Sequence, residues 1–526
     1  MEKQLIVFNG GLQTKLSPHL LQDNQAVECV NINLDKGSIY PLNGLTYETS
    51  INGEYVYQED ENIISNTDPL DVRDYARFGT RIYWTNGTYN SYGLMRYDGT
   101  NTGVEATAPV APNGVVGLTA TGTNESLYGD YTYTYTYVDT DGIESAPTGY
   151  YTVSCNNQNV NIVISSETNT PNDLLYRRIY RTGGNNPTYN LVAEITGLTF
   201  TDNIRDIDVS RIELATFENN PAPTNLTNLI ENNGTMWGSV GDKVYFSING
   251  HPEYWNSLDY LQLNDDCTGI GKFGEQTLVF TRADAYVVTG FNRDTVSMTK
   301  LPYREGCMNH RSIANVGDYL VWSSKNGVCV YNGANVQIAT RNILSWNELA
   351  RVGDETFDDF NTVFDSNTGY EIVDGLALQG KYYAVFNNGI GILRIEDFQV
   401  ASTIEIDGIK SLYYDDINNF IVAVIKTDTG YEAKSIDTDS GNKMTSLWRT
   451  GEIQGEEGYG VLKHYRKIQL DNTPIYVKVK AGDKEFTMHG KKDFFLPPSF
   501  TGYTIQIEIA TNNEIRSLEY QYGVKK

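Results

Sequence analysis

The sequence predicts an all-β protein with a propeller-like body, an inserted β-sandwich and a C-terminal β-domain. Short runs of alternating apolar and polar residues recur along the 526 residues, as half-buried strands require. Asn-Gly, Asp-Gly and Gly-Asp pairs separate many of these runs, and such pairs form tight turns. Helical periodicity is weak and limited to stretches such as residues 17–29 and 343–352.

Residues 1–110 form the first predicted segment, an N-terminal strap followed by a first blade region. The blade region includes residues 75–97, YARFGTRIYWTNGTYNSYGLMRY, in which Asn86-Gly87 separates two strand-like runs. Because the same kind of unit recurs after residue 222, we interpret this region as a blade of one sheet-based body.

Residues 111–221 form the predicted insertion, with Pro-containing spacers on both sides. Tyr131–Val138 reads YTYTYTYV, a period of two that places Tyr on one face of a strand and Thr on the other. A Glu-Ser-Ala-Pro turn, a Tyr-Arg-Arg-Ile-Tyr-Arg strand and a closing Thr201-Asp202 follow. This pattern resembles a fibronectin type III module, which implies a spacer or an adhesive surface and no particular activity.

Residues 222–450 carry a loose repeat that predicts propeller blades. Each unit has a Gly-containing turn and a strand rich in Tyr or Trp, as in Val240–Ser247, Val316–Ser323 and Gln379–Phe386. Repeated four-stranded sheets bury their faces against neighbours and leave few exposed edges. Two alternatives stay open at this point, namely a run of independent hairpins and a second large sandwich.

Residues 451–526 form the predicted C-terminal β-sandwich-like domain, which differs from the rest of the chain in charge. It has 11 basic and 10 acidic residues, a net charge of +1, whereas the remainder carries −27. Its basic cluster could face an acidic neighbouring subunit or lie close to DNA, or it could be an ordinary solvated strand face. The cluster consists of Lys463, Arg466, Lys467, Lys491 and Lys492.

The net charge of −26 argues against a general binder of nucleic acids or anionic membranes. No run of about 18 apolar residues is present, so we expect no membrane span. The apolar stretch Leu5–Phe8 is too short for a secretion signal, and we therefore expect synthesis in the cytosol. Five scattered cysteines without a Cys-x-x-Cys pair predict unpaired thiols, and five scattered histidines predict no zinc site.

No catalytic motif stands out, so we expect a protein that is not an enzyme and holds no cofactor or metal. Nucleophile elbows and P-loops are missing from the sequence. Asp437–Gly441 begins like a calcium loop, but its twelfth position is Trp448 instead of Glu. Cys307 and His310 form the densest reactive cluster, which we interpret as a demanding connection between blades. The six tryptophans are expected to pack blades, with sugar stacking as the alternative.

The opening residues resemble those of tail proteins of short-tailed bacteriophages, a group that includes tail nozzles and packaged-DNA stabilisation (tail tubular) proteins. The shared pattern is F-x-G-G-L-x-T, x-P-x-x-L, A-x-x-x-x-N-x-x-L and G-x-[LI]-x-P-x-x-G, over about 45 residues. Adjacent glycines also permit a backbone excursion, so we expect a folded strap with a role in assembly. The family-signature residues are Asn9, Gly10, Gly11, Pro18, Asn31, Gly37, Pro41 and Gly44.

This resemblance implies a structural protein of the virion tail, assembled in the host cytoplasm. It implies a ring of subunits, six by analogy, with portal, adaptor and tail fibre proteins as further partners. The ring would form the distal tail tube, retain the packaged genome, and conduct DNA through its lumen without reading its sequence. An acidic wall suits that role because carboxylates repel phosphates over about a Debye length.

A carbohydrate-binding or carbohydrate-degrading β-propeller adhesin with a fibronectin-like spacer is the alternative function. A general cell-surface binding protein is a third possibility. Propeller glycosidases usually carry Asp-box turns of the form S-x-D-x-G-x-T-W, and this chain has none. That absence counts against a degrading enzyme of this type.

Overall fold

The computed structural model describes residues 2–59, 61–68, 70–87, 93–344, 372–387, 391–455, 458 and 460–524. Strands dominate these residues, and their only helical elements are short 3-10 turns, which confirms the all-β prediction. No helix in the described part of the chain is long and apolar enough to cross a membrane. The chain divides into two compact units, residues 1–69, 268–287 and 299–526, and residues 70–267 and 288–298.

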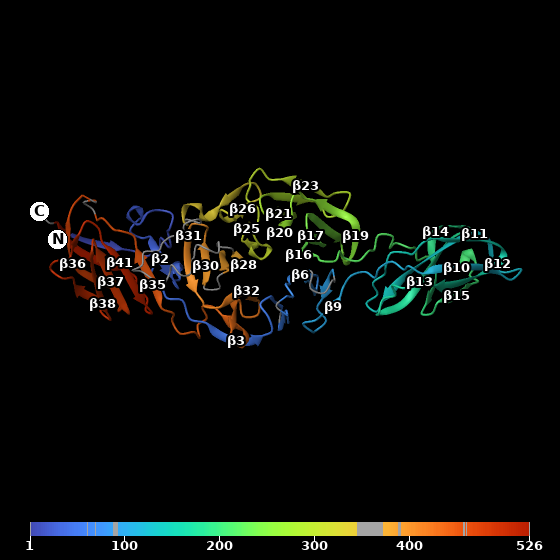
Figure 1. Cartoon of the computed structure of the whole chain (residues 1–526), viewed down its shortest axis with the longest axis horizontal. Helices are drawn as coiled ribbons and strands as arrows, with labels where there is room; N and C mark the ends of the chain where they lie inside the picture. The colour runs from blue at the N-terminus through green and yellow to red at the C-terminus, as the bar shows by residue number, and fades with distance from the viewer. Residues whose placement is uncertain are drawn as a thin grey trace. The chain divides into compact units, whose positions relative to one another are not determined.

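Two four-stranded antiparallel sheets in the second unit are built like propeller blades, with each strand bonded to the next along the chain (Figure 1). Trp84, Trp237 and Trp255 are buried in these sheets, as the sequence predicts for blade-packing residues. The strands are β6 (Asp74–Phe78), β7 (Arg81–Thr85), β8 (Met95–Arg96), β9 (Val104–Glu105), β16 (Thr227–Asn232), β17 (Thr235–Val240), β18 (Lys243–Ile248) and β19 (His251–Gln262).

Three more runs of four strands follow the same pattern along the chain. Their strands bond in chain order, the first two runs as separate four-stranded sheets and the third run at one end of a larger sheet, so independent hairpins do not describe this region. These strands are β20 (Cys267–Phe273), β21 (Gln276–Thr281), β22 (Ala285–Thr289), β23 (Ser297–Lys300), β24 (Ala314–Val316), β25 (Tyr319–Ser324), β26 (Gly327–Tyr331), β27 (Val336–Ile338), β28 (Ile372–Leu378), β29 (Lys381–Phe386), β30 (Gly391–Glu396) and β31 (Val400–Glu405).

The repeat found in the sequence corresponds to hairpins in the structure, but its copies lie at different positions within their sheets. Val316–Ser323 and Gln379–Phe386 lie at the turn between the first and second strands of their sheets, whereas Val240–Ser247 lies between the second and third. Every hairpin of a blade needs the same tight turn and the same buried strand, so the local pattern cannot identify which hairpin it belongs to.

The last blade takes one strand from the beginning of the chain. Strands β32 (Ile409–Asp415), β33 (Phe420–Thr427) and β34 (Gly430–Ser435) pair in order, and β3 (Thr46–Ile51) adds to β34 with Thr46 opposite Ser435. The hairpin of β4 (Val56–Glu59) and β5 (Asn62–Ser65) covers this sheet through an apolar cluster around Val56. This blade and the four-strand runs that precede it along the chain confirm a propeller-like body.

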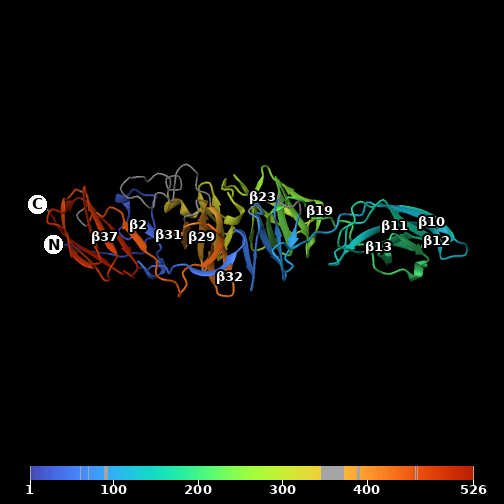
Figure 2. The same cartoon turned by 60° about the horizontal axis from the view of Figure 1, so that its bottom comes forward.

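The insertion is a β-sandwich of six strands. Its long strand β12 belongs to both sheets, because its first half pairs with β11 and its second half with β10 and β15 (Figure 2). The finer assignment to the fibronectin type III type stays a prediction. The strands are β10 (Val115–Thr121), β11 (Leu127–Asp139), β12 (Tyr151–Ser165), β13 (Leu174–Gly183), β14 (Asn186–Ile195) and β15 (Thr199–Asp202).

Four tyrosines of β11, Tyr131, Tyr133, Tyr135 and Tyr137, face the core of the sandwich, as their period of two predicts. Their hydroxyls are not left unpaired. The Tyr133 hydroxyl donates to Asp202 at 2.7 Å, and the buried guanidinium of Arg181 donates to the same carboxylate at 2.6 Å. Burial raises the pKa of Tyr133, which therefore stays a neutral donor. Tyrosine suits these positions because it adds a hydrogen bond to a large apolar side chain.

The C-terminal residues form two sheets together with strands from elsewhere in the chain. The first sheet has the order β1-β42-β36-β39, and the second joins β31, β2, β35, β41, β37 and β38. The sheets predicted for residues 451–526 therefore also include β1, β2 and β35, and the two chain ends lie side by side (Figure 1). The strands are β1 (Glu2–Ile6), β2 (Ala26–Val30), β35 (Ser446–Thr450), β36 (Lys463–Leu470), β37 (Tyr476–Ala481), β38 (Lys484–His489), β39 (Asp493–Phe495), β40 (Thr501–Gly502), β41 (Gln506–Thr511) and β42 (Leu518–Val524).

Of the two weakly helical stretches, residues 17–29 contain one 3-10 turn, Pro18–Leu20, and most of strand β2. Apolar residues at Leu20, Leu21 and Ala26 produced a helix-like spacing, but cross-strand pairing to β35 determines the outcome. The second stretch, residues 343–352, lies mostly outside the described residues.

A buried ion pair connects three neighbouring sheets of the first unit. The guanidinium of Arg311, just before β24, approaches the carboxylate of Asp374 in β28 at 3.4 Å. The same carboxylate accepts a hydrogen bond of 2.7 Å from the backbone N–H of Leu412 in β32. Burial raises the pKa of Asp374, and Arg311 opposes that rise. The side chain of Asp374 thus connects segments of three sheets.

We expect Arg311→Ala to reduce the free energy of unfolding by about 3 kcal/mol at pH 7, because it leaves the Asp374 carboxylate buried and unpaired. The loss should shrink as the pH falls towards 4, since a raised pKa lets Asp374 take up a proton in the folded state. Urea unfolding followed by circular dichroism measures both effects.

Arg304→Ala is the control, because the Arg304 side chain is 82% exposed and lies 3.9 Å from its nearest carboxylate. It should change stability by no more than about 0.5 kcal/mol. Equal losses in the two variants, or a loss that does not depend on pH, would contradict the proposed role of the Arg311–Asp374 pair.

Candidate functional site: the N-terminal strap

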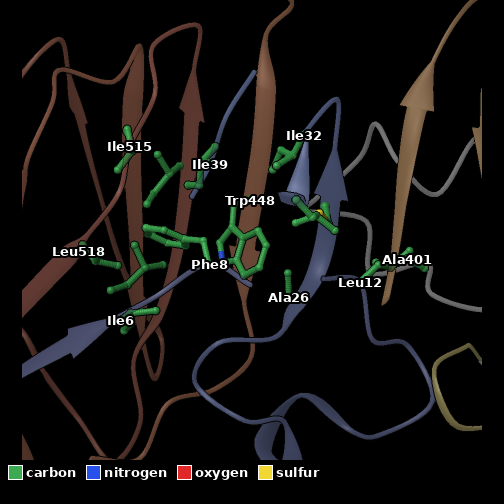
Figure 3. Close-up of a cluster of buried hydrophobic side chains, with 14 of the residues drawn as sticks. Ile6, Phe8, Leu12, Ala26, Ile32, Ile39, Ala401, Trp448, Ile515 and Leu518 are labelled. Carbon is green, nitrogen blue, oxygen red and sulfur yellow. The ribbon is translucent and has the colours of Figure 1, made fainter. Parts of the chain in front are cut away.

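The strap, defined here as residues 8–44, runs between the sheets of the first unit and is held in their core. Phe8 is fully buried and meets the ring of Trp448 edge-on, with ring centroids 5.4 Å apart and planes at 80° (Figure 3). Leu12 and Ala26 join the same apolar cluster, which also includes Ile515. The strap therefore contributes core residues and does not simply cover a surface.

Gly10 and Gly11 are required by the close approach of other backbone segments. The Gly10 N–H donates to the Asn24 carbonyl at 2.9 Å, and a Cβ on Gly10 would lie 2.5 Å from that oxygen. Gly11 has φ +63°, and its Cβ would lie 2.6 Å from Cγ1 of Val400. A side chain at either position cannot be accommodated without moving the backbone.

Asn9 and Pro18 position the loop that follows the glycines. The Asn24 side-chain amide donates to Oδ1 of Asn9 at 2.8 Å. Pro18 begins a 3-10 turn, and its carbonyl accepts a hydrogen bond of 2.8 Å from the backbone N–H of Glu452. This turn is three residues long, Pro18–Leu20.

Asn31 connects two distant strands through its backbone and its side chain. Its φ of 56° lies in the left-handed region, which asparagine tolerates better than most residues. The Asn31 N–H donates to Thr403 in β31, and its side-chain amide donates to the carbonyl of Thr445, next to β35. The Asn31 carbonyl accepts from the hydroxyl of Ser446 at 2.6 Å.

Gly37, Pro41 and Gly44 guide the strap to the last blade. Gly37, with φ +64°, ends the 3-10 turn Leu34–Lys36, and its N–H donates to the Leu34 carbonyl. Between these glycines the strap pairs through isolated bridges, at Ile39 with Ile515 and at Pro41 with Ile32. The Pro41 carbonyl accepts from Nζ of Lys443 at 3.0 Å, and Gly44 lies tightly against the chain near residue 441.

A row of buried charges crosses the sheet that the strap enters, and sequence reasoning missed it. Arg449 of β35 forms an ion pair with Glu28 of β2 and lies 3.8 Å from Glu508 of β41. The Tyr476 hydroxyl donates to Glu508 at 2.8 Å. These residues are far apart in the chain, and only their cross-strand register brings opposite charges together.

All eight signature residues thus lie in one connector, which joins the blade strand β31 to the C-terminal sheets through β2 and β35. Their contacts are backbone hydrogen bonds, turns and close chain approaches. Such an arrangement can fix the position of a sheet within the first unit, and it offers no nucleophile or acid–base pair for catalysis.

The predicted basic cluster is not one surface, and Lys463 has to be removed from it. Lys463 is fully buried, and its Nζ donates to the carbonyls of Gly458, Val461 and Tyr503 at 2.8–3.3 Å. Alternation along β36 turns this lysine inward, which a count of nearby basic residues cannot reveal.

The other four residues of the cluster are at least partly accessible. Arg466, Lys491 and Lys492 are exposed, whereas Lys467 is half-buried and forms an ion pair of 3.0 Å with Asp493. For these four residues, the predicted surface role remains a proposal.

The Cys307 and His310 pair is engaged in structural contacts. Cys307 is buried and its thiol donates to the carbonyl of Asn309 at 3.1 Å. Nδ1 of His310 accepts a hydrogen bond from the backbone N–H of Ile270 at 3.3 Å. These contacts fit the predicted connection between two sheets better than a nucleophile with its base.

The structure offers neither a metal cluster among its described residues nor exposed tryptophans among those it describes. Among the described residues, no group of three or more His, Cys, Asp or Glu side chains could hold a metal ion. Asp437, at the head of the calcium-like loop, accepts a hydrogen bond from the backbone N–H of Asn43. Five tryptophans are at most 1% exposed, so they pack the core and cannot stack on a sugar, and Trp346 lies outside the described residues.

No family model and no curated protein matches this chain. Solved β-propeller structures are similar to it at low level. The propeller domain of the Trilobed protease from Pyrococcus furiosus is 10% identical, with 70% of this chain and 96% of that chain covered and a TM-score of 0.28. AztD from Citrobacter koseri is 12% identical, with 76% and 99% covered and a TM-score of 0.29.

Virginiamycin B lyase from Staphylococcus aureus is 10% identical, with 62% of this chain and all of that chain covered and a TM-score of 0.27. At such identities and TM-scores, the similarities indicate nothing about activity. The order of strands in the chain's own sheets is therefore the basis for the propeller-like body.

We expect Gly11→Ala to lower the free energy of unfolding by about 3 kcal/mol or more. The added Cβ would combine left-handed strain of about 1–2 kcal/mol with a collision against Val400 and the carbonyl of Ala401. Gly37→Ala is the matched control, because its φ is nearly the same and nothing lies within 4 Å of the added Cβ.

Gly37→Ala should therefore lose only about 1–2 kcal/mol. Urea unfolding curves of the two variants, compared with the unchanged chain, measure the difference. Losses of equal size would show that backbone conformation alone, and not close packing, requires glycine in the strap.

Lys463→Met should destabilise the C-terminal sheets by about 3 kcal/mol, because three partly buried carbonyls lose their donor while the side-chain volume is nearly kept. Arg466→Ala, on the exposed side of the same strand, should change stability by less than about 0.5 kcal/mol. Thermal unfolding of both variants tests this assignment, and a stable Lys463→Met protein would refute it.

Proposed function

We propose that this chain is a non-enzymatic structural subunit of the tail of a short-tailed bacteriophage, belonging to the tube or nozzle. The supporting observation is the strap. The residues that carry the sequence resemblance coincide with the positions at which the backbone needs glycine, proline or asparagine to connect a blade strand with the C-terminal sheets. The resemblance therefore extends to residues with a definite structural task.

In this proposal several copies, six by analogy with the group, form a ring in the virion tail after synthesis in the host cytoplasm. The ring contacts portal, adaptor and tail fibre proteins, and packaged DNA passes through its lumen. A net charge of −26 supports passage without retention, because an acidic wall offers the phosphates few cations. Arg466, Lys467, Lys491 and Lys492 are the proposed contacts with an acidic neighbour or with DNA.

The second candidate function is a carbohydrate-binding propeller adhesin that carries the sandwich as a spacer. The propeller-like body favours this candidate as much as the first, and it is the feature shared with the solved propeller structures. The buried tryptophans speak against sugar stacking on the blades. We therefore keep the tail subunit as the main proposal.

Two measurements distinguish the candidates. We expect negative-stain electron microscopy of the purified chain to show rings, and antibodies against the chain to label the tails of particles of the phage that encodes it. A monomer that is missing from purified particles and that binds or cleaves glycans would contradict the tail proposal and support the adhesin.

A further inference from the structure

Three aromatic side chains lie together at the surface of the inserted sandwich. Tyr150, which immediately precedes β12, is 53% exposed, and Phe217 is 49% exposed. Tyr189 of β14 lies between them, with ring centroids 5.4 Å from Tyr150 and 6.4 Å from Phe217. Clustered exposed aromatic rings of this kind usually mark a binding surface.

The strand register places Tyr150 on the outer face of the sheet β12-β11-β13-β14. Tyr151 lies opposite Tyr133, whose side chain points into the core, so its neighbours Tyr150 and Thr152 point outward. Tyr189 packs with Tyr180 and Leu191 in a separate apolar cluster, away from the tyrosines of the core. The aromatic cluster therefore belongs to the outer face.

Hydroxyl groups border the aromatic cluster on the same face. Thr152, Thr132 and Thr182 form one row across three strands, because Thr132 pairs with the other two. The hydroxyls of Thr132 and Thr152 are 3.2 Å apart. Further along β11 and β12, the Asp130 carboxylate accepts a hydrogen bond from Ser154. This border can both donate and accept hydrogen bonds.

The charges on this face disfavour an anionic ligand. The guanidinium of Arg178, on the outer side of β13, is already paired with Glu144 at 2.6 Å and with Glu194 at 2.9 Å. Asp130 and the net charge of −26 would repel phosphate or sulfate groups. Nucleic acids and acidic polysaccharides therefore do not fit this surface.

We propose that this face binds neutral carbohydrate. The faces of sugar rings carry C–H groups that pack on aromatic rings such as Tyr150 and Tyr189, and their hydroxyls exchange hydrogen bonds with threonine hydroxyls and a carboxylate. The site is independent of the proposed tail function, because a glycan-binding insertion suits a tail subunit and an adhesin equally. It assigns a ligand class to a module that the sequence describes only as a spacer or an adhesive surface.

The test uses the full chain and four neutral oligosaccharides, namely maltohexaose, cellohexaose, mannohexaose and chitohexaose, with a heparin hexasaccharide as the anionic probe. We expect at least one neutral oligosaccharide to bind in isothermal titration calorimetry, and heparin not to bind. The variant Tyr150→Ala/Tyr189→Ala should lose affinity by about tenfold or more.

Phe495→Ala is the matched control, since Phe495 is a 74% exposed aromatic residue in the C-terminal sheets and should keep full affinity. Circular dichroism and thermal unfolding check that the double variant is folded, and Thr152→Ala, a milder change on the same face, should weaken binding by a smaller factor. The proposal is overturned if no neutral oligosaccharide binds, if heparin binds more tightly, or if the double variant folds and binds as well as Phe495→Ala.

Discussion

Pairing between the two ends of the chain is the constraint on which the first unit depends. Strand β1 completes the sheet that ends the chain, β2 links the blade strand β31 to β35, and β3 supplies the fourth strand of the last blade. Each addition satisfies backbone groups that would otherwise form an open sheet edge, where other chains could pair. A lesion in the first 50 residues should therefore act on sheets that lie some 400 residues away in sequence.

Buried charged residues lie where segments from distant parts of the chain meet. The Glu28–Arg449–Glu508 row lies where β2 enters the sheet, and the Arg311–Asp374 pair lies where three blade sheets meet. Removing charges from water is costly, and opposite charges with well-placed hydrogen bonds offset that cost. Such pairs also penalise a wrong register, because a shift by one residue would leave a charge buried without its partner. We regard them as devices that fix which strand pairs with which.

The chain thus combines an acidic exterior, a β-rich framework and buried tryptophans, with no constellation suited to catalysis among the side chains described above. These features agree with the architectural role proposed above, in which the strap residues that resemble phage tail proteins position sheets of the first unit. The strands of the inserted sandwich pair with one another and add nothing to the other sheets that the structure describes. Its partly exposed Tyr150 and Tyr189 contrast with the buried tyrosines of the same module, and they are the residues that we propose to contact a ligand.

The sequence alone determined what depends on neighbours in the chain: strands from their period of two, turns from glycine and asparagine, the inward tyrosines of β11, and the unusual backbone of the strap at Gly10 and Gly11. It could not determine which strands pair over hundreds of residues, so it gave residues 451–526 a domain of their own, although β1 and β2 complete it. The burial of Lys463 cannot be predicted from the sequence, because composition does not record the direction of a side chain. Burial and register are properties of the assembled sheets, and only the tertiary structure decides them, because they depend on contacts between segments whose local sequences are compatible with many partners.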